Sequence, residues 1–127
     1  MHQMYMKRRH LEREYRQRYD AIHRGQMLVD GAKRRSSKKK MPYDLDAYRD
    51  LIEARVQKGL CELTGLPLDF HTKGMQWNSP SIDRIDSSAG YVYTNIRIVC
   101  FGMNAAMGNW GEKALRLIVT NWLAKTT

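Results

Sequence analysis

Long apolar runs are missing from this 127-residue chain. No run approaches the roughly 18 consecutive apolar residues that a membrane span needs, and the first residues lack the apolar core of a secretion signal. The two cysteines, Cys61 and Cys100, are too few for the disulfide framework of a small secreted protein. Internal repeats are absent as well. We therefore expect a soluble cytoplasmic protein without a membrane partner, and its length suits one domain.

Positive charge, in contrast, is plentiful and unevenly placed. The net charge is +9, and residues 1–40 carry all of it with 13 Lys and Arg against four acidic residues, so residues 41–127 are neutral. A basic arm beside a neutral body favours a polyanionic partner, most often nucleic acid, over the alternative of a solvated helix that only maintains solubility. The arm residues expected to bind DNA are Lys7, Arg8, Arg9, Arg13, Arg16, Lys33, Arg34, Arg35, Lys38, Lys39 and Lys40.

The arm is predicted to be a helix followed by a linker. Residues 4–24 contain neither Gly nor Pro and are mostly good helix formers. Four residues of this helix align on one narrow apolar stripe, which can dock on the body, pair with a second subunit or lie along DNA. Residues 33–40 contain no apolar residue to bury, which predicts a mobile basic linker. The stripe consists of Met4, Leu11, Tyr15 and Ile22.

The body, residues 41–127, is predicted to be α+β. A helix is expected from about residue 44 to 58, and the following segment to residue 80 is interrupted by Gly and Pro, which indicates loop. Two β-branched segments, 81–85 and 95–99, predict a hairpin, and a helix is expected over 99–107. The last helix, about 110–125, has apolar residues at i, i+3, i+4 and i+7, which predict a buried face. That face comprises Leu115, Ile118, Val119 and Trp122.

Three polar residues of the hairpin and its following helix carry the candidate chemistry. Asp83 falls on the first strand, Asn95 begins the second, and Asn104 lies on the helix. A strand pair folded against a helix can bring a carboxylate and an amide oxygen together. Mg²⁺ usually binds through one or two such protein oxygens, while phosphate and water complete its shell.

The residues around these positions form an ordered series of short motifs. They read S-I-D-R-I-D over residues 81–86, G-Y at 90–91, N-I-R-I-V over 95–99 and N at 104, after a C-E-L-T-G segment that begins at residue 61. This series resembles the ββα-metal core of the HNH (His-Me finger) endonucleases, particularly small phage-encoded members. The resemblance covers about residues 60–108 and implies an HNH-like core with flanking helices and a basic N-terminal helix.

The resemblance implies a metal-dependent DNA endonuclease or nickase that hydrolyses phosphodiester bonds. Asp83 and Asn104 would hold one Mg²⁺ or Mn²⁺, and Asn95 would help to position the residue at the base position. The family has a His base directly after the metal-binding Asp, and this chain has Arg84 there. A guanidinium stays protonated and cannot take a proton from water, but it can bind a phosphate through two hydrogen bonds.

A different group would then have to activate water. The candidates are His71, Tyr91, Tyr93 and Asp86. A histidine titrates near neutral pH, which suits a base. Each candidate also has a plain structural interpretation: a loop histidine in solvent, two packing tyrosines, and an aspartate that caps a turn. The superfamily includes members with Arg at the His position and a Tyr proposed as the base.

A second difference from the family concerns structural zinc. Related phage junction-resolving enzymes carry two Cys-x-x-Cys knuckles around a structural zinc. The corresponding positions here are Cys61 with Thr64 and Cys100 with Met103. Two thiolates without a nearby His make a poor tetrahedral site, so we expect no structural zinc. The two cysteines are instead expected to be small buried residues, close to each other.

Three functions remain open at this stage. The first is the endonuclease, acting on duplex or branched DNA. It would act in the host cytoplasm if the protein is phage-encoded. It would be a homodimer if the apolar stripe of the arm packs against the same stripe of a second subunit. The second is a catalytically silent nucleic-acid-binding protein on a degenerate HNH fold. The third is a protein-interaction or inhibitor factor that uses the basic arm. The set of Asp83, Asn95 and Asn104 favours the first over the second, because a decayed site has no chemical reason to retain both implied metal ligands.

Overall fold

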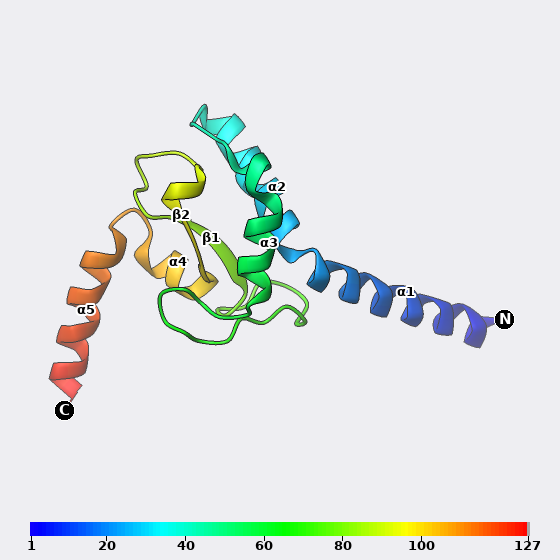
Figure 1. The fold of residues 1–127 in the computed structure, drawn as a ribbon. Helices are drawn as coiled ribbons and strands as arrows, with labels where there is room; N and C mark the ends of the chain where they lie inside the picture. Colours follow the sequence, from blue (N-terminus) through cyan, green and yellow to red (C-terminus); the bar gives the residue numbers. More distant parts are fainter. Residues whose placement is uncertain (127) are drawn as a thin grey trace.

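A two-stranded antiparallel sheet lies at the centre of the fold (Figure 1). The structure is a computed structural model and describes residues 1–126. Strands β1 (Pro80–Arg84) and β2 (Ile96–Cys100) pair in a register that places Asp83 opposite Arg97. Successive strand residues point to opposite faces. Asp83 therefore faces one side of the sheet, and Ile82 enters the core on the other.

Helices surround this hairpin. In the described residues, α1 (His2–Ile22) and α2 (Arg24–Lys39) come first, followed by the 3₁₀ turn η1 (Leu45–Tyr48) and by α3 (Arg49–Gln57). The 3₁₀ turn η2 (Tyr93–Asn95) leads into β2, which passes directly into α4 (Phe101–Met107), and α5 (Gly111–Thr126) ends the chain. The predicted α+β architecture, with its hairpin and following helix, is confirmed. Among residues 1–126, no helix has the length and apolar character to cross a membrane.

The core joins α2, α3 and the sheet. Val29 of α2, Ile52 and Val56 of α3, and Ile82 and Ile98 of the two strands are all buried in one cluster. Full burial of a large aliphatic side chain stabilises the fold by about 1.5–3 kcal/mol. The hairpin is thus fixed from behind by two packed helices, which leaves its other face to α4.

The segment over residues 33–39 is helical with Lys40 as its C-cap, and the prediction of a mobile linker over residues 33–40 is wrong. It forms the C-terminal part of α2, which continues through Gly31 to Lys39. Val29, Ala32 and Ser36 share the inner side of this helix and are buried. The sequence pattern missed it because two of these three residues are small or polar and contribute little hydrophobicity. The division into an arm of residues 1–40 and a domain of residues 41–127 stays a prediction.

The expected buried face of α5 is largely exposed, so the prediction that the last helix buries this face is wrong. Ile118 is 64% exposed and Trp122 is 65% exposed, while Leu115 and Val119 are half-buried. The helix contacts α4 and then extends away from the rest of the chain (Figure 1). The apolar spacing indicated correctly that the segment is helical. Whether the chain itself covers an apolar face depends on tertiary packing, which the spacing does not contain.

Helix α3 fixes the junction between α1 and α2. The side-chain amide of Gln57 donates to the carbonyls of Ala21 and Ile22, at 2.8 and 3.2 Å, at the end of α1. The Glu53 carboxylate accepts from backbone N–H groups in the first turn of α2, at 2.8 Å for that of Gly25. Helix ends leave such groups without intrahelical partners. A Cβ at Gly25 would lie 2.6 Å from the Glu53 Cα, so only glycine permits this approach.

We expect Glu53→Ala to lower the free energy of unfolding by about 1–2 kcal/mol, because it removes the carboxylate that caps α2. Urea unfolding followed by far-UV circular dichroism measures the change. The matched control is Glu12→Ala on exposed α1, where we expect a change within about 0.5 kcal/mol. Equal effects of the two substitutions would contradict the capping role of Glu53.

Candidate functional site

Asp83 is buried on the face of the hairpin that α4 covers. Its side chain is only 10% exposed, and its Oδ2 accepts a hydrogen bond of 2.8 Å from the Nε of Arg97. The antiparallel register sets this contact, because Arg97 is the residue directly opposite on β2. A buried carboxylate without a partner costs several kcal/mol. The ion pair offsets that cost and fixes the orientation of the carboxylate.

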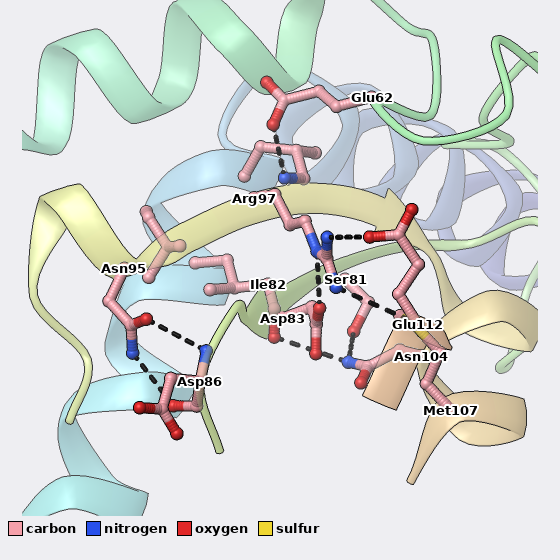
Figure 2. Close-up of polar contacts among 12 residues, drawn as sticks. Glu62, Ser81, Ile82, Asp83, Asp86, Asn95, Arg97, Asn104, Met107 and Glu112 are labelled. Atoms are coloured by element: carbon pink, nitrogen blue, oxygen red, sulfur yellow. Dashed lines mark hydrogen bonds and ion pairs between the residues drawn. The ribbon is translucent and has the colours of Figure 1, made fainter. Parts of the chain in front are cut away.

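Arg97 is itself held by three groups (Figure 2). Besides Asp83, it contacts the carboxylate of Glu112 on α5 at 3.2 Å and the sulfur of Met107 on α4 at 3.6 Å. Burial disfavours the charged form of Arg97, but hydrogen bonds and attraction to Asp83 and Glu112 outweigh it and raise its pKa. Arg97 is therefore a fixed cation that links both strands to α4 and α5.

Asn104 reaches the same place from α4. Its Nδ2 donates to the Ser81 hydroxyl at 2.7 Å and to the Ile82 carbonyl at 3.4 Å. Figure 2 shows its side chain beside Asp83. Both hydrogen bonds that the Asn104 side chain makes to the described residues use the amide nitrogen, so its Oδ1 remains available as an acceptor. The structure thus places Asp83 and Asn104, here called the ligand pair, next to each other.

The start of α4 determines where Asn104 points. Strand β2 ends at Cys100 and α4 begins at the next residue, so no loop lies between them. The N–H groups of Phe101 and Gly102 donate to the carbonyls of Ser79 and Trp77, at 2.7 and 2.6 Å. These bonds tie the first turn of α4 to the segment just before β1. The ligand pair is therefore positioned by short, hydrogen-bonded connections on both sides.

The ligand pair fits a hard divalent cation. Only Oδ2 of Asp83 is bonded to the described residues, which leaves its other oxygen and the amide oxygen of Asn104 for a ligand. Within residues 1–126, no three His, Cys, Asp or Glu side chains gather in a way that could hold a metal ion. Mg²⁺ needs only one or two protein oxygens, because water and substrate phosphates supply the others. The donor chemistry therefore suits Mg²⁺ or Mn²⁺.

Asn95 lies at the far end of the hairpin, away from the ligand pair (Figure 2). Its side chain accepts from the Asp86 N–H at 3.0 Å and donates to the carbonyls of Asp86 and Gly90, at 3.1 and 2.9 Å. These bonds close the loop between the strands. Gly90 is required there, because a Cβ would collide with the Pro42 carbonyl. The positioning role expected for Asn95 stays a prediction.

Arg84 points away from Asp83, its neighbour on β1. Its Nη1 donates to the carbonyls of Ser87 and Ala89, at 2.9 and 3.3 Å. Its guanidinium also lies over the Tyr91 ring, 5.1 Å from the centroid. Adjacent strand residues face opposite sides, so the Arg84 side chain supports the hairpin loop. The structure does not bring it to the ligand pair.

Comparison with solved structures places this arrangement among known folds. The chain is similar to the rare-cutting HNH restriction endonuclease PacI, described as perturbing DNA, with a TM-score of 0.55 and 18% sequence identity. The similarity covers 80% of this chain and 78% of that chain. The fold is HNH-like. No protein-family model and no curated protein matches the sequence. In this HNH-like fold, the ββα unit is formed by β1, β2 and α4, the elements that carry the ligand pair.

Two other expected catalytic residues of the HNH-like domain, His71 and Tyr93, make their contacts elsewhere. His71 is exposed on a loop, where its backbone N–H donates to the Asp69 carboxylate at 2.8 Å. Tyr93 is half-buried and stacks on Tyr48, with ring centroids 4.4 Å apart. The guanidinium of Arg55 lies 5.3 Å from the Tyr93 centroid. The contacts of both residues are thus with groups other than Asp83 and Asn104.

Two further base candidates are also engaged elsewhere. The Tyr91 hydroxyl accepts from the Nε of Arg35 at 3.1 Å, and the tyrosine is buried. Asp86 accepts from both the N–H and the hydroxyl of Ser88, and these bonds lower the pKa of its carboxyl. Asp86 therefore caps the loop turn, the structural interpretation considered for it.

Arg97 and Glu112 were missed by the sequence argument. The available signal was a charged residue between Ile96 and Ile98 in a strand whose other positions are apolar, because a charge in a buried strand needs a partner. That signal identifies Arg97 as an ion-pair residue. It does not identify Glu112, which comes from another helix and meets Arg97 only through the fold.

The expected DNA-binding residues divide into two groups. Those of α1 are exposed. On α2, Lys33 pairs with Asp46 at 2.8 Å and Arg35 binds Tyr91, so these two also stabilise the body. The other expected residues lie on the exposed side of α2 or directly at its end. They are Arg34, Lys38, Lys39 and Lys40.

Cys61 and Cys100 are free, buried and adjacent, which confirms the prediction that they are small buried neighbours. Burial raises the pKa of the Cys100 thiol. Burial acts the same way on Cys61, but hydrogen bonds from Thr64 and from the backbone N–H of Cys100 outweigh it and lower its pKa. The expectation that the site holds no structural zinc stays a prediction.

Proposed function

We propose that this chain is a metal-dependent DNA endonuclease or nickase that hydrolyses phosphodiester bonds at the ligand pair. The observation that carries the proposal is the placement of the Asp83 carboxylate beside the Asn104 amide on an HNH-like ββα unit. The solved protein with a similar fold, PacI, is a restriction endonuclease. Asp83 and Asn104 would hold one Mg²⁺ or Mn²⁺. When bound there, the ion supplies a Lewis acid that stabilises negative charge on the scissile phosphate.

The protein's own contribution is to hold the two ligands in a fixed arrangement. Arg97 fixes one oxygen of Asp83, and the hydroxyl of Ser81 orients the Asn104 amide so that its oxygen stays available. Residues that orient a metal ligand commonly contribute about 10–100-fold to metal affinity or activity. Because both ligands are oriented before substrate arrives, little reorganisation is needed during the reaction.

DNA would be held by the exposed basic residues of α1 and α2. Helix α1 carries six Lys and Arg against three acidic residues, and it projects from the body (Figure 1). Phosphate contacts of this kind depend on charge and carry no base sequence information. The arm therefore supplies affinity for duplex or branched DNA, and the ligand pair supplies the cleavage chemistry.

A plasmid cleavage assay tests this function. The protein is incubated with supercoiled plasmid, and in parallel with a four-way junction, in Mg²⁺, in Mn²⁺ and in EDTA. We expect open-circular or linear plasmid, or cut junction arms, only where a divalent ion is present. If no DNA form is cut in either metal, the endonuclease proposal is wrong.

A catalytically silent DNA-binding protein is the second candidate. It is favoured by a specific observation: within residues 1–126, no side-chain hydrogen bond or ion pair joins Asp83 or Asn104 to Arg84 or to any of the base candidates. Gel-shift binding in the same buffers separates the two proposals. DNA binding without cleavage supports the silent protein, and metal-dependent products exclude it.

A further inference from the structure

Cys61 and Cys100 lie together in the core, and the proposed function uses neither of them. Both thiols are free, and the residues are only 2% and 3% exposed. The two thiols are hydrogen-bonding partners, and the backbone N–H of Cys100 also donates to the Cys61 sulfur. The residue after Cys61 fixes this contact. The N–H of Glu62 donates to the Ile98 carbonyl at 2.8 Å, and its carboxylate accepts from the Ile98 N–H at 2.8 Å.

Each sulfur accepts hydrogen bonds from the surrounding chain. The Cys61 sulfur accepts from the backbone N–H groups of Leu63 and Thr64 and from the Thr64 side chain. Cys100 is the N-cap of α4, and its sulfur accepts from the N–H of Met103 in the first turn of that helix. Burial raises the pKa of the Cys61 thiol, but its donors outweigh burial and lower the pKa. A stabilised thiolate is the reactive form of cysteine, so Cys61 is suited to act as the nucleophile.

Two thiols in contact can bind a soft metal ion or react with an oxidant. A tetrahedral metal site needs more ligands, and within residues 1–126 no third His, Cys, Asp or Glu joins the two thiols. Oxidation needs only the two sulfurs. A disulfide bond is about 2 Å long, so sulfurs already in contact need only a small displacement. Burial keeps a second chain away from both sulfurs, and hydrogen peroxide is small enough to reach them.

We propose that Cys61 and Cys100 form a dithiol site that hydrogen peroxide oxidises to a disulfide within the chain. The Cys61 sulfur attacks one peroxide oxygen, an S–O bond forms and the O–O bond breaks. The departing oxygen takes up the thiol proton and leaves as water. The Cys100 sulfur then attacks the Cys61 sulfur, the S–S bond forms, the S–O bond breaks and a second water leaves. Two thiols are oxidised by two electrons, and one peroxide is reduced to two waters.

The disulfide would connect two elements that only hydrogen bonds join in the reduced chain. Cys61 begins a turn that closes when the Gly65 N–H donates to the Cys61 carbonyl at 2.8 Å. Cys100 ends β2 and precedes α4, the helix that carries Asn104. The C-E-L-T-G segment thereby gains a role that the ligand pair does not give it. This inference goes beyond the proposed function and does not depend on it.

Thiol counting and mass measurement test the site without any assay of activity. The reduced full chain is treated with hydrogen peroxide, unfolded in guanidinium chloride and labelled with N-ethylmaleimide. We expect two labels per chain before oxidation, none after it, and two again after reduction with dithiothreitol. The intact mass should fall by two hydrogen atoms. A non-reduced tryptic digest should join the Cys61 peptide to the Cys100 peptide, and a non-reducing gel should show a single chain.

Two single variants test the order of the steps. Cys100→Ser keeps the nucleophile and removes its partner, so peroxide should leave a sulfenic acid at Cys61 that dimedone labels. Cys61→Ser is expected to give at least about tenfold less dimedone label at Cys100. The matched control combines Cys100→Ser with Ser88→Cys, which restores two thiols but places the second on the exposed loop at the other end of the hairpin. We expect no disulfide within that chain.

Four results would overturn the proposal. They are a wild type that keeps two labels after peroxide, oxygen atoms added to sulfur without an S–S bond, a disulfide between two chains, and a disulfide within the chain of the Ser88→Cys control. A metal ion in the native mass spectrum of the reduced wild type that is released on oxidation would also contradict it, because the thiols would then be metal ligands. The wild-type measurements need no variant, so a variant that does not fold leaves the test complete. DNA cleavage is not part of any readout, so failure of the endonuclease proposal leaves the dithiol site standing.

Discussion

Asp83→Asn is expected to reduce metal-dependent DNA cleavage by at least about 100-fold. The substitution keeps the size of the side chain and removes its negative charge, which is the main attraction for a divalent cation. Asparagine is preferred to alanine, because its amide oxygen can still accept from the Nε of Arg97 in the buried contact. The measurement is the initial rate of nicking of supercoiled plasmid in Mg²⁺ and in Mn²⁺.

The chain offers a matched control for this substitution. Asp86 belongs to the same S-I-D-R-I-D motif, but its carboxylate lies on the exposed loop and binds Ser88. Asp86→Asn makes the same chemical change, and we expect a rate within about threefold of wild type. Asn104→Asp retains an oxygen ligand and is expected to remain more active than Asn104→Ala. If Asp83→Asn and Asp86→Asn cut equally well, Asp83 has no role in cleavage.

Removal of residues 1–22 is expected to weaken DNA binding by about 10–1,000-fold at low salt and to flatten its salt dependence. These residues comprise all of α1, whose six Lys and Arg are exposed and lie on a helix that contributes no buried residue to the core. Every phosphate that the shortened protein no longer neutralises reduces the slope of log K against log salt concentration by about 0.9. Fluorescence anisotropy of a labelled duplex over a range of salt concentrations measures both quantities.

The deletion ends at residue 22 because α2 is part of the core. Val29 and Ala32 are fully buried, so a deletion through residue 40 would unfold the body and would not report on DNA binding. Substitution by Gln provides a charge-matched comparison without deletion. Changing the three basic residues over 7–9 together should reduce the slope, whereas changing Lys58, Lys73 and Lys113 of the body should not. An unchanged slope in the α1 variants would mean that α1 does not bind phosphates.

The parts of the fold that the sequence predicted are those with local signals. The hairpin and α4 follow from β-branched segments separated by a turn, and β2 passes into α4 without a loop, so Asn104 had few alternative positions. The tight packing of Gly90 against Pro42 explains why glycine occupies that position of the motif. The proximity of Asp83 and Asn104 was therefore accessible from the pattern, while their role as metal ligands stays a prediction.

The parts that the sequence did not predict depend on contacts between distant segments. Helix α2 docks through Ala32 and Ser36, which have too little apolar surface to produce a recognisable stripe. The orientation of Arg84 follows from strand alternation and from the loop carbonyls that its guanidinium binds. The contact of Arg97 with Glu112 requires both the strand register and the placement of α5. None of these is encoded in the spacing of one segment.

Paramagnetic broadening by Mn²⁺ tests the central claim most directly, because it locates the ion without requiring the right DNA substrate. In amide spectra of the ¹⁵N-labelled protein, substoichiometric Mn²⁺ is expected to broaden the signals of Ile82, Asp83 and Asn104 first. The same addition to the Asp83→Asn variant is expected to leave these signals sharp. Broadening that centres on other carboxylates, such as Asp46, while the signals of Asp83 and Asn104 stay sharp in the wild type, would contradict the account.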